Sequence, residues 1–366
     1  MINLHGLILA DRSSHELREL VMCRTSASLP YAGRYRLIDF ALSSMQNALV
    51  RDVGVIMQQD YQSLLDHIGS GKEWDMSRKR GGLKLLPPFT GSGEYEGIID
   101  ALENVRGYIE DIKQDYVAIM RGHLAASIDL ADVMYRHVKS GADVTAVCSE
   151  TTPEGSHHRF LVDEDGFVKE IMLRRTGPGE GVATLEVYIM SKEVLLGIIE
   201  RCDNALNHKF HRDGLGGLLA AGGKIAVYMH NDYAVHISSV NGYYKASMDM
   251  LDREKRNQLF PESRPVRTKG RSDVSTYYGD KSISRNSLVA DGCIIEGQLE
   301  NCVIFRGVRV GAGAVLKNCI IMQDTVISDG VELNYVISDK DAFISPDVTL
   351  SGSPRLPLVL PKGSKV

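Results

Sequence analysis

Short apolar segments alternate with amphipathic stretches along the first 250 residues. Residues 1–10 are mostly apolar and show no helical spacing, which predicts a buried strand. Similar segments recur at residues 53–57, 116–120, 143–148 and 186–190. Leu37–Met45 and Leu130–Val138 instead carry apolar residues at helical spacing. The alternation persists to about Leu251 and predicts an α/β domain over residues 1–251, with a mostly parallel sheet covered on both faces.

A six-residue period replaces this pattern after residue 281. Val315, Ile321, Ile327 and Leu333 are six residues apart, and turn-forming residues such as Ser328-Asp329-Gly330 fill the gaps. This spacing is typical of hexapeptide coils that stack into a parallel β-helix. The chain has eleven histidines and none falls in the repeats. A histidine-dependent acyltransferase is therefore not expected, and we expect the repeats to serve packing, oligomerisation or regulation.

Residues 252–280 separate the two patterns and are rich in Arg, Lys, Pro, Ser and Gly. This composition predicts an extended linker. The basic run at residues 264–271 is either a phosphate-binding strip or a set of solvated linker charges, and the second is the commoner case.

Charge and cysteine usage exclude several classes of protein. Lys plus Arg is 42 and Asp plus Glu is 47, so the net charge of −5 argues against a nucleic-acid partner. The apolar runs are too short to cross a membrane, and the first residues do not resemble a signal peptide. Six cysteines form no CxxC pair, which favours buried thiols in a reducing cytoplasm over disulfides or a zinc site.

Three motifs give the chain a specific resemblance. They are Gly-Arg-Tyr-Arg-Leu-Ile-Asp-Phe-Ala-Leu-Ser at 33–43, His-Ile-Gly-Ser-Gly-Lys-Glu-Trp-Asp at 67–75 with Arg-Gly-Gly at 80–82, and residues 287–295 at the entry to the repeats. They resemble segments of the glucose-1-phosphate adenylyltransferase (ADP-glucose pyrophosphorylase) family. The resemblance implies a Rossmann-like, GT-A-like nucleotidyltransferase domain with a mixed sheet, followed by a left-handed parallel β-helix at 281–366.

The phosphate-binding residues of that family are replaced here. Its glycine-rich G-G-x-G-x-R-L loop corresponds to Asp11–Leu17, with Glu16 at the arginine position. Ser26 stands at a phosphate-contacting lysine, and Glu94 at a tryptophan beside the nucleotide, while Gln59 keeps the nucleotide-loop glutamine position. A carboxylate facing a polyphosphate repels it at a place where nucleotidyl transfer needs a cation.

The metal and sugar positions have changed as well. His123 and His236 occupy the places of the two aspartates that bind Mg²⁺ in the family, and Mg²⁺ accepts imidazole poorly. Zn²⁺ would need a third protein ligand, and the sequence offers no evident one, so we expect no metal. Arg174 stands at the sugar-phosphate lysine, and Glu186 replaces a glycine of the hexose pocket. The resemblance therefore indicates a retained scaffold without the catalytic groups.

Two arginines are candidates for binding a regulatory ligand. Arg24 and Arg36 match positions in the family's activator pocket, which takes phosphorylated sugars in many of its members. Both residues could equally be structural ion-pair partners.

The pattern most resembles the GlgD-type regulatory subunit of the family. This implies a non-catalytic chain that has no cofactor of its own, with Mg²⁺ needed only by a catalytic glucose-1-phosphate adenylyltransferase partner, in a hetero-oligomer expected to be a tetramer. Its role would be to change the activity or effector response of that partner during glycogen synthesis. Two alternatives stay open: an active pyrophosphorylase with a rearranged site, and a free-standing sensor of a sugar phosphate or nucleotide.

Overall fold

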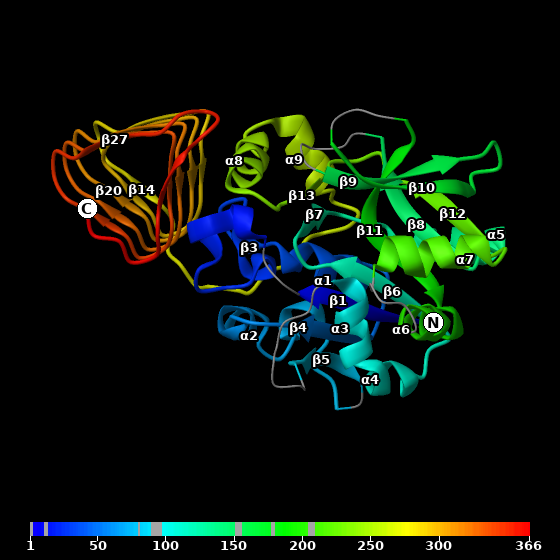
Figure 1. The fold of residues 1–366 in the computed structure, drawn as a ribbon. Helices are drawn as coiled ribbons and strands as arrows, with labels where there is room; N and C mark the ends of the chain where they lie inside the picture. The colour runs from blue at the N-terminus through cyan, green and yellow to red at the C-terminus, as the bar shows by residue number, and fades with distance from the viewer. Residues whose placement is uncertain are drawn as a thin grey trace.

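A computed structural model describes residues 3–10, 14–79, 81–88, 97–150, 156–176, 180–203 and 209–366, without the side chains of residues 156, 157, 174–176 and 203. Figure 1 shows an α/β domain beside a stack of C-terminal coils. No helix in these ranges is both long and apolar enough to cross a bilayer.

A nine-stranded sheet forms the centre of the α/β domain, in the order β10-β9-β11-β6-β1-β4-β5, with β8 pairing both β11 and β12. Its strands are β1 (Leu4–Ala10), β4 (Asp52–Met57), β5 (Gly82–Leu86), β6 (Tyr116–Arg121), β8 (Val144–Ser149), β9 (Ser156–Val162), β10 (Val168–Thr176), β11 (Val182–Ser191) and β12 (Ile225–Met229). Two-stranded sheets are made by β2 (Pro30–Tyr31) with β3 (Tyr35–Arg36) and by β7 (Leu124–Ala126) with β13 (Ala234–His236).

The sheet is mixed rather than mostly parallel. Strands β6, β1, β4 and β5 run parallel to their neighbours in this group. Strand β11 runs antiparallel to β6, β8 and β9, so the half of the sheet built around it departs from the prediction. The mixed sheet that the family resemblance implied is confirmed.

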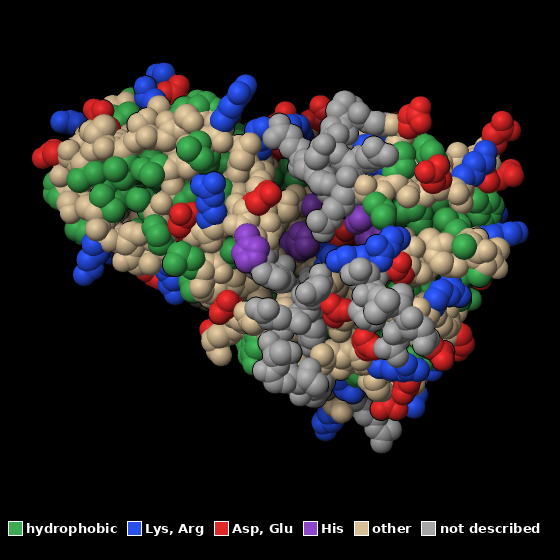
Figure 2. Space-filling view, in the orientation of Figure 1, with side chains coloured by type: hydrophobic (Ala, Val, Ile, Leu, Met, Phe, Trp, Pro, Cys, Tyr) green, Lys and Arg blue, Asp and Glu red, His purple; other side chains and the backbone are tan. Residues whose placement is uncertain are grey.

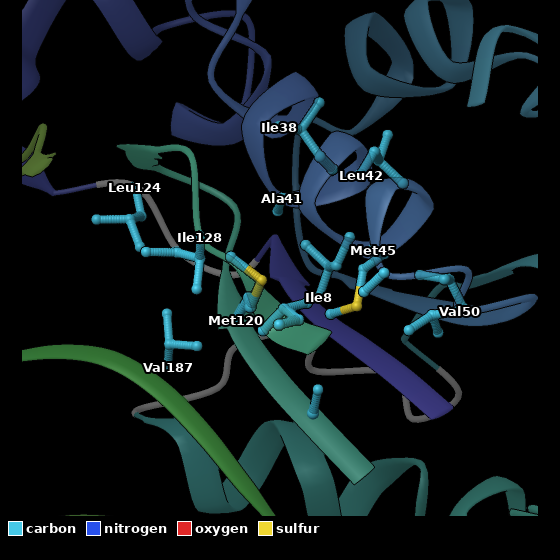
Figure 3. Packing of buried hydrophobic residues seen from close by; sticks show 14 of the residues in the cluster. Ile8, Ile38, Ala41, Leu42, Met45, Val50, Met120, Leu124, Ile128 and Val187 are labelled. Atoms are coloured by element: carbon cyan, nitrogen blue, oxygen red, sulfur yellow. The ribbon is translucent and has the colours of Figure 1, made fainter. Parts of the chain in front are cut away.

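Helices cover the two faces of this sheet and bury separate hydrophobic clusters. One cluster joins Ile8 and Val55 of the sheet to Ile38 and Met45 of α1 (Figure 3). The opposite cluster joins Leu7 and Ile119 to α3, α4 and α6. The helices are α1 (Ile38–Asn47), α2 (Gln62–Ile68), α3 (Ile98–Asn104), α4 (Arg106–Glu110), α5 (Leu130–Ser140), α6 (Lys192–Asp203), α7 (Gly216–Ala220), α8 (Val240–Asp249) and α9 (Arg253–Leu259), with short turns η1 (His15–Val21), η2 (Ser26–Ser28), η3 (Lys72–Trp74) and η4 (Phe210–Leu215).

The C-terminal repeats form three parallel five-stranded sheets, which confirms the predicted β-helix. The sheets are β14-β17-β20-β23-β26, β15-β18-β21-β24-β27 and β16-β19-β22-β25-β28. Their strands are β14 (Tyr277–Tyr278), β15 (Ile283–Arg285), β16 (Leu288–Val289), β17 (Ile294–Ile295), β18 (Gln298–Glu300), β19 (Val303–Ile304), β20 (Arg309–Val310), β21 (Val315–Lys317), β22 (Ile320–Ile321), β23 (Val326–Ile327), β24 (Glu332–Asn334), β25 (Val336–Ser338), β26 (Phe343–Ile344), β27 (Thr349–Ser351) and β28 (Leu358–Leu360).

One position of the predicted repeat is shifted. In β21 the buried residue is Leu316, which pairs with Leu299 and Leu333 of adjacent coils, while Val315 is only half-buried. Strict six-residue counting fails there because the paired residues Leu299, Leu316 and Leu333 are 17 residues apart, one fewer than three six-residue segments require.

The segment between the domains is more structured than expected. Residues 253–259 form helix α9, whose first turn is capped by the Asp252 carboxylate, so the prediction of an extended linker was wrong there. Strand β14 pairs with β17, and the first coil therefore begins before residue 281.

The α/β domain and the β-helix share a hydrophobic cluster. Leu37 and Phe40 of the first domain pack in the same cluster as Phe305, Met322 and Ile337 of the coils. This shared core holds the two parts against each other. Figure 1 shows the β-helix lying beside the α/β domain.

Candidate functional site

The structure brings His123 and His236 side by side in the α/β domain. Strand β6 ends at Arg121, and the backbone of His123 leads into β7, which pairs antiparallel with β13. Leu124 lies opposite His236, and Ile237 N donates to the His123 carbonyl at 3.3 Å. The two imidazole centroids are 5.5 Å apart. Two segments more than a hundred residues apart thus place their histidines at one point.

These histidines do not provide a Mg²⁺ site. Mg²⁺ requires oxygen ligands in near-octahedral geometry, and the two side chains here offer only imidazole nitrogen. Burial, with a further contribution from Arg121, lowers the pKa of His123 to about 4, so this ring is neutral at physiological pH. The residues therefore do not fit the ion that the family resemblance implies.

An ion pair next to these histidines lines a pocket of the α/β domain, which together with the two histidines we call the cleft. Arg121 Nε donates to Glu186 Oε2 at 2.5 Å, and the two side chains are 14% and 19% exposed. Although burial alone would raise the pKa of Glu186, Arg121, His211 and His236 hold it well below its usual range. Glu186 is therefore ionised at neutral pH.

The backbone at Glu186 is unusual for a residue with a side chain. Its φ angle is +52°, in the left-handed region that favours glycine, and the pairing of β11 with β8 shifts register between Thr184 and Val187. The glycine that the resemblance expects at this position would suit this conformation, whereas Glu186 is strained there and places a carboxylate in the cleft.

Two further histidines complete the cleft, and the sequence analysis did not find them. His158 of β9 and His211 of η4 stack with ring centroids 3.7 Å apart. Together with Arg121 and Glu186 they line a pocket of about 380 Å³. Figure 2 shows histidine side chains gathered in this hollow. Because residues 158, 186 and 211 have no motif spacing, only the folded sheet reveals their proximity.

The other described residues that the sequence analysis singled out at family positions do not line the pocket. Ser26 is buried in η2, Glu16 is exposed in η1, and Gln59 is exposed just beyond β4. Arg174 lies in β10, but its side chain is outside the described part of the structure, as are Asp11, Arg12, Ser13, Arg80 and Glu94.

The predicted regulatory arginines lie away from this cleft, where the α/β domain meets the β-helix. Arg24 donates from both terminal nitrogens to the Asp339 carboxylate, at 2.9 and 2.8 Å, and the two side chains are 2% and 1% exposed. Arg36 Nη1 donates to the carbonyl and hydroxyl oxygens of Ser63 at 2.6 and 2.8 Å. The geometry thus gives Arg24 a structural partner in the coils.

Lys340 is a third cation of this group, which we call the interdomain cluster (Arg24, Arg36, Asp339 and Lys340). Burial, with repulsion from Arg36 and Arg24, lowers the pKa of Lys340 to about 7. Burial and Arg24 likewise lower the pKa of Arg36 to about 10. The sequence analysis missed Lys340 because it lies in the repeats, three hundred residues from the motif it joins.

The retained motifs meet next to the interdomain cluster. Asp39, which is fully buried, accepts from Arg36 N at 2.9 Å and lies 2.5 Å from His67 Nε2. The His67 ring in turn packs edge-on against Trp74. The motifs at 33–43 and 67–75 therefore bind each other and support the scaffold.

Two family models match the chain. A nucleotidyl transferase model matches residues 5–252, and a model of the GlmU-like C-terminal hexapeptide region matches residues 273–354. The chain belongs to the nucleotidyl transferase family, with a hexapeptide-repeat domain at its C-terminus.

The similar proteins indicate which branch of the nucleotidyl transferase family the chain resembles. The glycogen biosynthesis protein GlgD of Bacillus subtilis is 35% identical over 318 residues, covering 85% of this chain and 82% of the relative. GlgD of Geobacillus stearothermophilus is 36% identical over 320 residues, and glucose-1-phosphate adenylyltransferase of the same organism is 32% identical over 323 residues, each with 85% of this chain and 82% of the relative covered. The resemblance to the glucose-1-phosphate adenylyltransferase family is confirmed.

Proposed function

We propose that this chain is a non-catalytic regulatory subunit of the GlgD type, which assembles with a catalytic glucose-1-phosphate adenylyltransferase in glycogen synthesis. The observation that carries the proposal is the pair His123 and His236, whose rings meet where the family resemblance expects two Mg²⁺-binding carboxylates. Nucleotidyl transfer from ATP needs a metal ion and cations to stabilise charge on the phosphates.

The surroundings of the cleft support the same conclusion. Ser26 offers a neutral hydroxyl in place of a lysine, and Glu16 adds a negative charge in place of an arginine. The scaffold motifs and the shared core with the β-helix are intact. A chain that keeps its framework and loses its phosphate chemistry is suited to assembly with a catalytic homologue, as a hetero-oligomer that we expect to be a tetramer.

The names of the relatives and the state of the cysteines support a role in glycogen synthesis in the cytoplasm. Two of the relatives carry the name glycogen biosynthesis protein GlgD. All six cysteines are free thiols, and five of them are buried. Free thiols suit a reducing cytoplasm, where glycogen is made.

The decisive experiment compares three samples: this chain, a catalytic homologue from the same source, and the two co-purified. ADP-glucose formation from ATP and glucose 1-phosphate is measured in each. We expect no turnover by this chain alone, and a raised rate or altered activator response when both are present. Turnover by this chain alone would show that it is an enzyme, and failure to bind the homologue would favour a free-standing sensor.

We further propose that the interdomain cluster contributes to binding a sugar-phosphate effector through Arg36 and Lys340. Arg24 is committed to Asp339, so the informative variants are Arg36→Gln and Lys340→Gln. Fructose 1,6-bisphosphate serves as the probe, and both variants should weaken its effect on the assembled enzyme. The control is Arg34→Gln, because this arginine belongs to the same motif but its side chain is 47% exposed. An unchanged response in both variants would contradict the role of the cluster.

A further inference from the structure

Three potential metal ligands meet at one corner of the cleft. One donor atom from each of His158, Glu186 and His211 lies within 4.8 Å of the other two. Strand β9 pairs with β11, which brings His158 towards Glu186, and η4 supplies His211. We propose that these residues form a binding site for a transition-metal ion of the Zn²⁺ type. The proposal goes beyond the regulatory function and does not depend on it.

Glu186 is oriented as a metal-binding carboxylate should be. Arg121 Nε holds Oε2, and a carboxylate has enough lone pairs to bind a metal through its other oxygen at the same time. Such hydrogen bonds from neighbouring side chains commonly orient metal ligands. Glu186 also has a left-handed backbone conformation, in which glycine would be less strained.

His211 is oriented in the same way. Its Nε2 lies 2.7 Å from the Tyr188 hydroxyl, which lies 3.0 Å from Thr184 Oγ1. A ligand histidine is typically fixed by a hydrogen bond at the ring nitrogen that does not bind the metal, so Nδ1 would be the donor atom of His211.

His158 is the side chain that must move. Its ring stacks on that of His211 with an angle of 18° between the planes, so the nitrogen lone pairs of the two rings lie in nearly parallel planes and do not converge on one ion. A turn of His158 out of the stack, beside a pocket of about 380 Å³, would direct one nitrogen towards the other two donors.

The donor set selects the kind of metal. Two imidazoles and one carboxylate suit Zn²⁺ and its neighbours in the transition series, whereas Mg²⁺ prefers oxygen ligands alone. Three protein ligands leave a coordination position open to water or to a ligand in the pocket. Among the residues that the structure describes, His123 and His236 belong to no group of three potential ligands. The three ligands that Zn²⁺ needs are offered instead by Glu186 with His158 and His211.

The test uses the full chain, stripped of metal with EDTA and titrated with Co²⁺ and with Zn²⁺. We expect one ion per chain and, for Co²⁺, visible absorption bands typical of nitrogen and oxygen coordination. His158→Gln, His211→Gln and Glu186→Gly should each weaken binding at least about tenfold. His137→Gln is the matched control, because His137 is hydrogen-bonded to Thr145 and lies outside the proposed ligand set.

Two results would overturn the proposal. One is that all three variants bind Co²⁺ and Zn²⁺ as tightly as the unaltered chain does, which would indicate adventitious binding to surface histidines. The other is displacement of Co²⁺ by a modest excess of Mg²⁺, which would indicate an oxygen site elsewhere. Circular dichroism checks that each variant is folded. If the variant of the buried His211 is not folded, the metal affinities of His158→Gln and Glu186→Gly test the proposal. Glu186→Gly should fold because glycine is less strained in the left-handed backbone conformation.

Discussion

The cleft and the interdomain cluster are both polar regions of the α/β domain, and they have changed to very different degrees. In the cleft, carboxylates expected from the family have become His123 and His236, and an expected glycine has become Glu186. At the interdomain cluster, Arg24 and Arg36 are the residues that the resemblance expects, and they donate hydrogen bonds to Asp339 and Ser63. The contact between the domains thus rests on side chains that match the family resemblance, whereas the cleft holds side chains that depart from it, which is what the proposed regulatory role requires.

The largest expected effect comes from breaking the interdomain ion pair. Arg24→Ala leaves the Asp339 carboxylate buried without its counter-charge, and we expect the free energy of unfolding to fall by about 3–5 kcal/mol. Urea denaturation measures this change. In Arg78→Ala, which removes the partner of the 75%-exposed Asp75, the loss should be about 1 kcal/mol or less. Equal losses in the two variants would contradict the structural role of Arg24.

Lys340 makes the same cluster sensitive to pH. Its pKa falls from its ordinary 10.5 to about 7 in the folded chain, so between these values the unfolded chain binds one proton more than the folded chain. The contribution of Lys340 to stability therefore rises with pH across this window, by up to about 1.4 kcal/mol per pH unit, and changes no further below about pH 7.

The groups that act on Lys340 are Arg24, Arg36, Asp339 and Lys362. Lys340→Met leaves these four in place and should flatten the pH dependence of urea denaturation between pH 7 and 10. A profile identical to that of the unaltered chain would show that Lys340 titrates normally.

The strained backbone of the cleft predicts a smaller difference. Glu186→Ala and Glu186→Gly both remove the partner of Arg121, but only glycine relaxes at a φ of +52°. We expect the Gly variant to be more stable than the Ala variant by about 1 kcal/mol. Thermal unfolding followed by circular dichroism measures the difference, and an Ala variant of equal or greater stability would show that the position carries no strain.

The smallest expected effect is a null result in the cleft. The double variant His123→Asp and His236→Asp restores the expected carboxylates, but Ser26 and Glu16 still provide no positive charge for the phosphates. We therefore expect no ADP-glucose from ATP and glucose 1-phosphate in the presence of Mg²⁺. Measurable turnover would show that the metal ligands alone separate this cleft from an active one.

Local sequence patterns predicted several helices and strands correctly, but they did not predict the directions in which the strands pair. The apolar run at residues 53–57 correctly predicted strand β4, and the helical spacing at residues 130–138 correctly predicted helix α5. Helix α9 was missed because its charged sequence shows no apolar stripe, although Asp252 is a good helix cap. The antiparallel placement of β11 was missed because a single strand carries no signal of its direction.

The same distinction holds for the candidate sites. Family motifs led to His123 and His236, and the fold brought these two residues together. No motif connects His158, Glu186 and His211, whose proximity depends on the pairing of β9 with β11 and on the position of η4. Lys340 was missed for a similar reason, since its altered pKa arises from burial against residues of the other domain.

The ion pair between Arg24 and Asp339 also bears on how the chain is made. Its partners are 315 residues apart, so during synthesis Arg24 leaves the ribosome long before the carboxylate that neutralises it. The apolar surface of Leu37 and Phe40 must wait equally long for Phe305 and Ile337. The first domain of a nascent or truncated chain thus exposes an uncompensated cation beside an uncovered hydrophobic face, which is a natural target for chaperones and proteases. Formation of the coils that carry Phe305, Ile337 and Asp339 removes both exposed features.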